Sequence, residues 1–136
     1  MTVKELSQLY WLRKEIERDE RRLEELRATI YNPSGGSAAG GHVQGGKVES
    51  KIERMAAEIV DLEAIITARY IQCAHERNRL ERYISTIEDS LIRQIITLRF
   101  VDGLAWYQVA QQIGGNTEDS VKKMCYRFLK KNGREE

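Results

Sequence analysis

Proline, cysteine and long apolar runs are scarce in this chain, and each shortage excludes a class of protein. The 136 residues include one proline and two cysteines, which leaves helices free to run long and is too little for a disulfide framework. Apolar runs cover only a few residues, so no membrane-spanning helix is expected, and the N-terminal sequence lacks the apolar stretch of a secretion signal. These absences favour a cytoplasmic protein with reduced thiols.

Residue combinations that carry catalysis or bind metals are missing as well. Cys73, Cys125, His42 and His75 do not have the spacing of metal ligands, and no nucleophile stands beside a general base in a pocket-forming context. Acidic residues are numerous, but their helical spacing is typical of surface charge. We therefore expect a protein that is not an enzyme and that binds no cofactor and no metal.

What the chain does have is a helical composition and an uneven distribution of charge. Apolar residues make up 41% and charged residues 32%, which is typical of long helices. The net charge is only +1, because residues 1–31 carry seven basic and seven acidic groups and residues 47–86 carry the same numbers. Residues 120–134, in contrast, carry six basic groups and no acidic one. This segment therefore favours a polyanionic partner.

Two long segments follow a heptad pattern and are separated by a glycine-rich stretch. Apolar residues recur at 3-4 spacing from Val3 to Tyr31 and again from Lys47 to Thr86. Between them, residues 32–46 contain six glycines and the proline, which predicts a mobile loop, and no phosphate-binding glycine motif is present. The pattern predicts an antiparallel helical hairpin over residues 1–86.

The pairing of these two helices can be predicted by counting outward from the loop. This count places Leu9 opposite Arg69 and Ile16 opposite Leu62. The apolar residues beside the seam that would then stay partly exposed are Trp11, Ile65, Tyr70 and Ile84. Their exposure favours self-association as a homodimer or a higher homo-oligomer.

A second domain of shorter helices is expected over residues 87–136. Residues 87–101 present one apolar face and end at Asp102-Gly103, where a glycine suits a left-handed helix cap. Residues 106–113 form a short helix that ends at Gly114-Gly115, and residues 117–131 form the last helix, which Asn116 or Thr117 can cap. We therefore predict an all-α fold in which a long antiparallel hairpin, or coiled coil, precedes a small helix-turn-helix bundle.

The last helix has an apolar side and a basic side. Val121, Cys125 and Phe128 share the apolar side, and two short helices joined by a glycine turn have the geometry of a helix-turn-helix. The basic side supplies contacts to phosphates, and Tyr126 and the first-turn residues are placed to reach base edges. The predicted contacts to double-stranded DNA come from Asn116, Thr117, Ser120, Lys122, Lys123, Tyr126, Arg127 and Lys130.

The segment "LIRQIITLRFVDGLAWYQVAQQIGGNTEDSVKKMCYRFLKK", residues 91–131, resembles the −35-binding region 4 of bacterial sigma factors. The similarity rests on Leu98-Arg99-Phe100, the turn Asp102-Gly103-Leu104, Val109-Ala110, Gly114 and the helix that follows. The whole chain also resembles phage-encoded transcriptional regulators of the RinA/ArpU type, in which a coiled coil precedes a sigma-like helix-turn-helix. This resemblance implies a phage or prophage transcription regulator in the cytoplasm of a bacterial host cell, with host RNA polymerase as a further partner.

Other functions remain open at this point. A basic face on a terminal helix is often only a solvated surface, and acidic Glu118 and Asp119 in the first turn oppose close phosphate contact there. A phage DNA-packaging adaptor of the small-terminase kind also joins a helix-turn-helix to coiled-coil helices. A structural coiled-coil interaction protein, whose basic face meets an acidic protein, has the same pattern.

Overall fold

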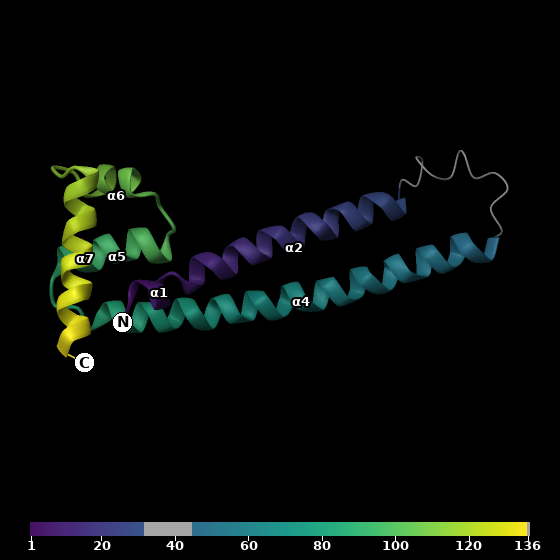
Figure 1. Ribbon diagram of the computed structural model, residues 1–136, viewed down its shortest axis with the longest axis horizontal. Helices are drawn as coiled ribbons and strands as arrows, with labels where there is room; N and C mark the ends of the chain where they lie inside the picture. The colour runs from purple at the N-terminus through teal and green to yellow at the C-terminus, as the bar shows by residue number, and fades with distance from the viewer. Residues whose placement is uncertain (32–44, 136) are drawn as a thin grey trace. The chain divides into compact units, whose positions relative to one another are not determined.

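The computed structural model describes residues 1–31 and 45–135, which form helices joined by turns, without a strand. The elements in chain order are α1 (Val3–Leu6), α2 (Gln8–Tyr31), α4 (Gly45–Ser85), α5 (Ser90–Ile96), η1 (Thr97–Val101), α6 (Trp106–Ile113) and α7 (Glu118–Glu135), as Figure 1 shows. The prediction of an all-α fold is confirmed. Most of the expected loop 32–46, with His42, lies outside the described residues, and its last two glycines already belong to α4.

Local hydrogen bonds explain where several helices begin. The Thr2 hydroxyl accepts the Glu5 N–H at 3.2 Å and caps α1. The expected helix from Val3 is interrupted at Ser7, whose hydroxyl donates to the Val3 carbonyl at 2.7 Å, before α2 starts at Gln8. Asp89 caps α5 by accepting the N–H groups of Leu91 and Ile92 at 2.9 and 3.3 Å. The expected helix from residue 87 therefore begins at Ser90.

The chain divides into two compact units. We call residues 1–13 and 72–136 the terminal unit, and residues 14–71 the hairpin unit. This division differs from the boundary at residue 86 that the heptad pattern suggests. The reason is that Leu6, Leu9, Leu80 and Ile84 share a buried cluster with the helices that follow residue 86.

The hairpin unit consists of antiparallel segments of α2 and α4. Ile16, Leu23, Leu26 and Ile66 are buried along its seam. Ion pairs flank the seam: Arg27 Nη2 lies 2.8 Å from Glu63 Oε1, and the Arg22 guanidinium lies 3.7 Å from the Glu58 carboxylate. Both pairs are solvent-exposed, so each contributes about 0–1 kcal/mol, and the apolar seam supplies most of the stability.

The predicted pairing of the hairpin is wrong by roughly one heptad. Arg69 binds Asp19, and its Nε lies 3.0 Å from Glu15 Oε2, whereas counting outward from the loop placed it opposite Leu9. The physical reason is that Arg69 and Asp19 are the polar residues that interrupt the two apolar seams. Pairing them leaves neither charge against an apolar partner, which fixes the pairing of the helices.

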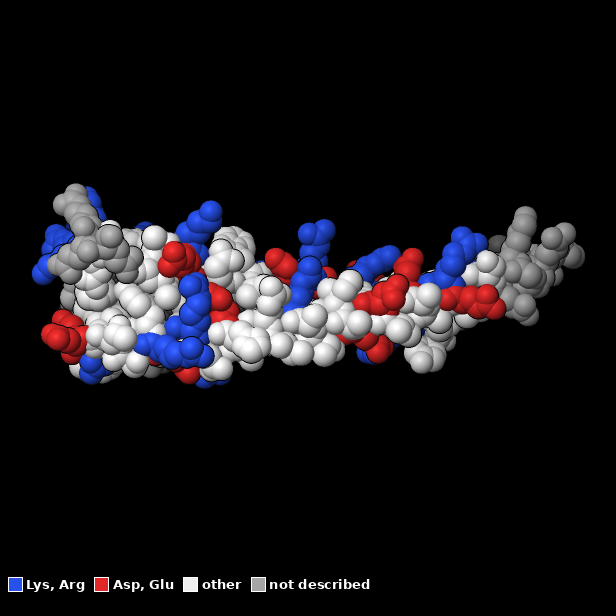
Figure 2. Space-filling model, turned by 90° about the horizontal axis from the view of Figure 1, so that it is seen from below, with Lys and Arg blue, Asp and Glu red and all other residues white. Residues whose placement is uncertain are grey.

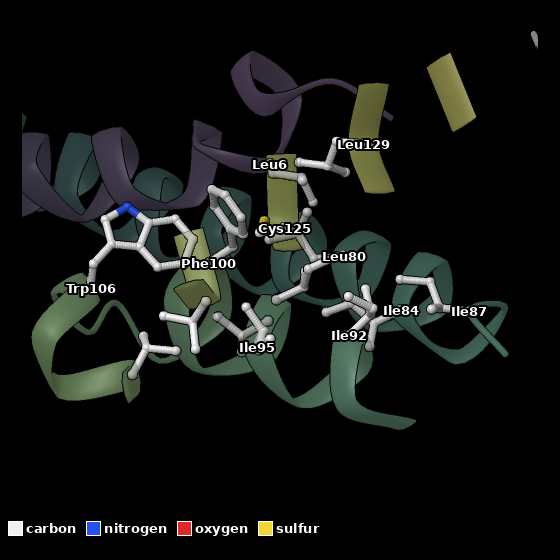
Figure 3. Close-up of a cluster of buried hydrophobic side chains, with 14 of the residues drawn as sticks. Leu6, Leu80, Ile84, Ile87, Ile92, Ile95, Phe100, Trp106, Cys125 and Leu129 are labelled. Atoms are coloured by element: carbon white, nitrogen blue, oxygen red, sulfur yellow. The ribbon is translucent and has the colours of Figure 1, made fainter. Parts of the chain in front are cut away.

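The terminal unit has one apolar core that gathers residues from both ends of the sequence. Figure 3 shows Leu6 from α1, Leu80 and Ile84 from α4, and Leu129 from α7 converging on the same cluster. Ile84, which was expected to stay partly exposed, is only 7% exposed because it belongs to this core. Trp11, Ile65 and Tyr70 are exposed as expected.

A π-helical segment and a glycine turn close α5 at its C-terminal end. The Asp102 N–H donates to the Thr97 carbonyl at 2.9 Å, which widens the helix before Gly103 takes a positive φ of 73°. Arg13 Nη1 donates to the Val101 carbonyl at 2.6 Å and so satisfies an acceptor at this helix end.

Within the described residues no helix has the length and apolar character to cross a membrane.

Candidate nucleic-acid interface

The candidate site is built on α6, the turn after it and α7. The side chain of Gln108 accepts the Ala105 N–H at 2.9 Å and so holds the start of α6. Trp106, Val109 and Ala110 point into the core and anchor one face of this short helix. The helix ends at Gly114, whose φ of 76° and ψ of 153° suit glycine alone. The chain is therefore turned sharply into α7.

The turn between α6 and α7 is held by side-chain hydrogen bonds. The Asn116 amide donates to the Gly114 carbonyl at 3.1 Å, and its oxygen accepts from the Ser120 hydroxyl at 3.3 Å. The Thr117 hydroxyl accepts the Ser120 N–H at 3.1 Å, so Thr117 is the cap that the sequence left open between it and Asn116. Three of the expected contact residues therefore shape the turn.

The buried side of α7 fixes the orientation of the helix. Val121 and Cys125 are fully buried, Leu129 is 5% exposed, and Met124 and Phe128 pack partly buried against the same core. Burial raises the pKa of the Cys125 thiol to about 12, against a weaker opposing effect of the Arg99 charge. Cys125 is thus a core residue and not a reactive thiol.

The opposite side of α7 is basic and exposed. Lys122, Lys123, Arg127 and Lys130 all have exposed side chains, and they lie on one broad face of the helix. Lys123 Nζ lies 2.9 Å from the Asp119 carboxylate, so part of its charge is already balanced within the helix. Among the described residues, Lys122, Arg127 and Lys130 have no ion-pair partner. This face therefore offers unbalanced positive charge.

Tyr126 lies on the same basic face and rests on the core through its ring. Its ring centroid lies 5.9 Å from that of Trp106 at an interplanar angle of 62°. The Arg99 guanidinium carbon lies 4.8 Å from the Trp106 ring centroid, and Arg99 Nη1 donates to the Leu104 carbonyl at 2.9 Å. The Tyr126 ring therefore packs against Trp106 on one side, and 39% of the residue's surface stays exposed to solvent.

The eight predicted contact residues thus separate into two groups along one edge of the terminal unit. Asn116, Thr117 and Ser120 shape the turn, and the remaining five make the exposed face, which we call the α7 face (Lys122, Lys123, Tyr126, Arg127 and Lys130). Sequence reasoning missed Trp106 of α6, which packs against Tyr126, and Arg99 of η1, which packs against Trp106. The signal in the sequence was the placement of Arg99 and Trp106 on either side of the turn at Asp102-Gly103.

Two further observations complete the description of the site. Among the described residues, no group of three or more His, Cys, Asp or Glu side chains is placed to hold a metal ion. Comparison with protein-family models, with curated proteins and with solved structures gives no match to this chain.

Proposed function

We propose that this chain is a sequence-specific DNA-binding transcriptional regulator of phage or prophage genes that places α7 against double-stranded DNA. The observation that carries this proposal is the α7 face, where three cations without an ion-pair partner in the described part of the chain lie around an exposed aromatic ring. The sequence resemblance of residues 91–131 to sigma factor region 4 supports the same partner. A helix face on which three of four cations lack an ion-pair partner among the described residues suits a polyanion better than solvent alone.

The residues of the α7 face have different roles in binding, which follow from the chemistry of their side chains. Lys122, Arg127 and Lys130 supply phosphate contacts, which give affinity and orientation without reading sequence. Tyr126 is the residue best placed to reach a base edge, because its ring is held by Trp106 and its outer part is exposed. Asn116 and Ser120 act mainly through the turn, since their side chains bond to each other.

The hairpin unit supplies self-association or contact with another protein in this proposal. Its exposed ion pairs contribute little to stability, and it carries large apolar side chains that water covers in a single chain, Tyr70 and Ile71 among them. A regulator of this kind gains from a second copy, because two copies bring two recognition helices to one DNA site.

The α7 face is tested by fluorescence anisotropy with a labelled random-sequence duplex at 50 to 300 mM salt. A variant with Lys122, Arg127 and Lys130 all changed to Ala is expected to lose most of its affinity. The negative slope of its log K against log salt should become shallower by about 2.7, at roughly 0.9 per lost phosphate contact. The proposal is rejected if the intact chain does not bind at 50 mM salt.

A matched control separates a local loss from the general effect of removing charge. Arg18, Arg21 and Lys51 are exposed cations of the hairpin unit, and changing all three to Ala removes the same net charge from another place. This control variant is expected to keep its affinity within about twofold and its salt slope within about 0.5. Equal losses in the two variants would assign the binding to net charge and not to α7.

Sequence specificity needs its own measurement. Repeated selection from a random duplex library, followed by footprinting, is expected to enrich one motif that the intact chain protects. Tyr126→Ala should bind the enriched motif less tightly while leaving the affinity for random DNA nearly unchanged, because a base contact adds discrimination and little non-specific affinity. Failure to enrich any motif would leave only a non-specific DNA-binding protein.

A further inference from the structure

A second heptad stripe runs along α4, on the side of the helix away from α2. Its members recur at spacings of three and four residues and carry no charge: Ala57, Val60, Ala64, Thr67 and Ile71. All five are exposed, and Val60 and Ile71 expose 65% and 55% of their surfaces. We call this set the α4 stripe. It lies opposite the seam residue Ile66, which is 8% exposed.

The outward face of the other helix has a different chemistry. The residues of α2 that point away from the seam include Glu17, Arg18, Arg21 and Glu24, all exposed. These segments of α2 and α4 belong to the same hairpin unit. If exposed apolar residues were equally acceptable anywhere on this unit, the outward faces of both helices would carry them. Figure 2, seen from the side of α4, shows uncharged surface running between charged groups along the hairpin. The α2 face suits water, whereas the α4 stripe has the pattern of a helix seam.

We infer that the α4 stripe pairs antiparallel with the same stripe of a second copy of this chain. This inference deepens the self-association in the proposed function by naming its surface. A second copy is the occupant because the stripe complements itself when one helix is reversed. In one antiparallel pairing Val60 packs against Ile71 of the second copy, and Ala64 packs against Thr67. The two most exposed aliphatic side chains among the described residues of α4 then cover each other on both sides of the two-fold axis.

The charges beside the stripe favour this pairing over the pairing that is shifted by one heptad toward Ala57. In the proposed pairing Glu63 lies beside Tyr70 of the second copy and Asp61 lies beside Ala68, so neither carboxylate meets a like charge. Shifting the helices by one heptad brings Asp61 against Asp61 of the second copy and Glu63 against Glu63. A parallel pairing is disfavoured because two of its three a positions, Ala57 and Ala64, are alanine and its d positions, Val60 and Thr67, are β-branched where leucine is preferred, so only Ile71 follows the preferred order.

The length of the α4 stripe sets the expected strength of the pair. From Ala57 to Ile71 the stripe is about 21 Å long at 1.5 Å per residue, so it buries less than the roughly 1,600 Å² of a standard interface. We therefore expect a dimer that dissociates on dilution through the micromolar range. Binding to DNA with two half-sites would hold the two copies together.

Sedimentation velocity at 1 to 200 μM total protein tests the pairing. The intact chain is expected to shift from monomer to dimer with rising concentration, and Val60→Glu and Ala64→Glu are expected to stay monomeric because each buries a charge in the pair. Ile65→Glu is the matched control, since Ile65 is a 45% exposed aliphatic of α4 that lies off the stripe. Circular dichroism confirms that all variants keep their helix content.

Cysteine cross-linking tests the direction and pairing of the helices. In a Cys73→Ser background, with Cys125 shielded by burial, a mixture of Val60→Cys and Ile71→Cys chains should form a disulfide dimer under mild oxidation. Neither variant should cross-link efficiently alone, because in the antiparallel pair residue 60 of one copy lies far from residue 60 of the other, and the same holds for residue 71. A strong dimer from Val60→Cys alone would mean a parallel pair and overturn the inference.

The inference and the proposed function fail in different ways. A chain that remains monomeric at 200 μM, or that forms a larger ring, overturns the α4 pairing. The salt-dependent binding of short random duplexes depends only on the α7 face, so it stays measurable in the monomeric Val60→Glu variant. Loss of that binding in the α7 variants, with dimerisation intact, supports both conclusions independently.

Discussion

At the scale of single residues, the surroundings of a side chain decide what it does on α7. Lys123 and Cys125 stand two positions apart, but one is exposed beside Asp119 and the other is fully buried. The helical period of 3.6 residues produces this separation, so the sequence predicted it correctly. The period does not reveal hydrogen bonds within a turn, and the roles of Asn116 and Ser120 as turn residues were therefore missed.

Thiol labelling checks the burial of Cys125. Its pKa of about 12 means that almost no thiolate is present at pH 8, and the core excludes the reagent as well. The native Cys73→Ser variant is therefore expected to react with less than about one-tenth of an equivalent of an aromatic disulfide reagent within minutes. In denaturant it should react with one equivalent. Rapid reaction of the native variant would contradict the packing of α7.

At the scale of elements, glycines and capping residues fixed most helix boundaries that the sequence predicted. The limits of α6 were predicted correctly, because Gly114 permits a backbone conformation that other residues avoid. The interruption at Ser7 and the π-helical segment at residues 97–101 were not predicted. Neither contains a proline or a glycine, and both are marked only by local hydrogen bonds, from the Ser7 hydroxyl to the Val3 carbonyl and from the Asp102 N–H to the Thr97 carbonyl.

One substitution made at two glycines should have opposite effects. Gly114→Ala is expected to lower the free energy of unfolding by about 1–3 kcal/mol, because alanine is strained at positive φ although the surroundings are open. Gly133 lies in α7 with open surroundings, so Gly133→Ala should be neutral or raise that free energy by up to about 1 kcal/mol. Urea unfolding followed by circular dichroism measures both. Equal destabilisation would contradict the turn geometry.

The pairing of α2 with α4 depends on one partly buried ion pair. Arg69→Ala is expected to lower the free energy of unfolding by about 1–3 kcal/mol, since it leaves Asp19 without its partner on the seam. Arg27→Ala removes an exposed ion pair from the same unit and should cost less than about 1 kcal/mol. Chemical denaturation at low and high salt compares them, and only the Arg27 effect should vanish in high salt. A smaller effect at Arg69 than at Arg27 would contradict the observed pairing.

At the scale of the molecule, the fold class could be predicted, whereas the pairing of the long helices could not. Heptad spacing identifies the apolar seams but repeats every seven residues, so it allows several pairings of similar burial. Asp19 and Arg69 were both visible as interruptions of the seams, and matching them to each other would have selected the observed pairing. Counting from the loop ignored that signal.

The salt dependence of DNA binding reports on the whole assembly. One α7 face with three cations in phosphate contact predicts a slope of log K against log salt of roughly −2.7, and a dimer on two half-sites predicts about twice that value. The slope should therefore steepen between short random duplexes and the selected motif. Val60→Glu should abolish this difference. An unchanged slope on the selected motif would argue against two recognition helices acting together.

The shared core of the terminal unit has a consequence for the order in which the protein can fold. Leu6 and Leu9 pack in the same cluster as Val121, Cys125 and Leu129, which leave the ribosome more than a hundred residues later. The nascent chain must therefore hold Leu6 and Leu9 without this core until residue 129 has been made. The hairpin unit, whose residues are all made by position 71, is free to assemble while the ribosome is still at work.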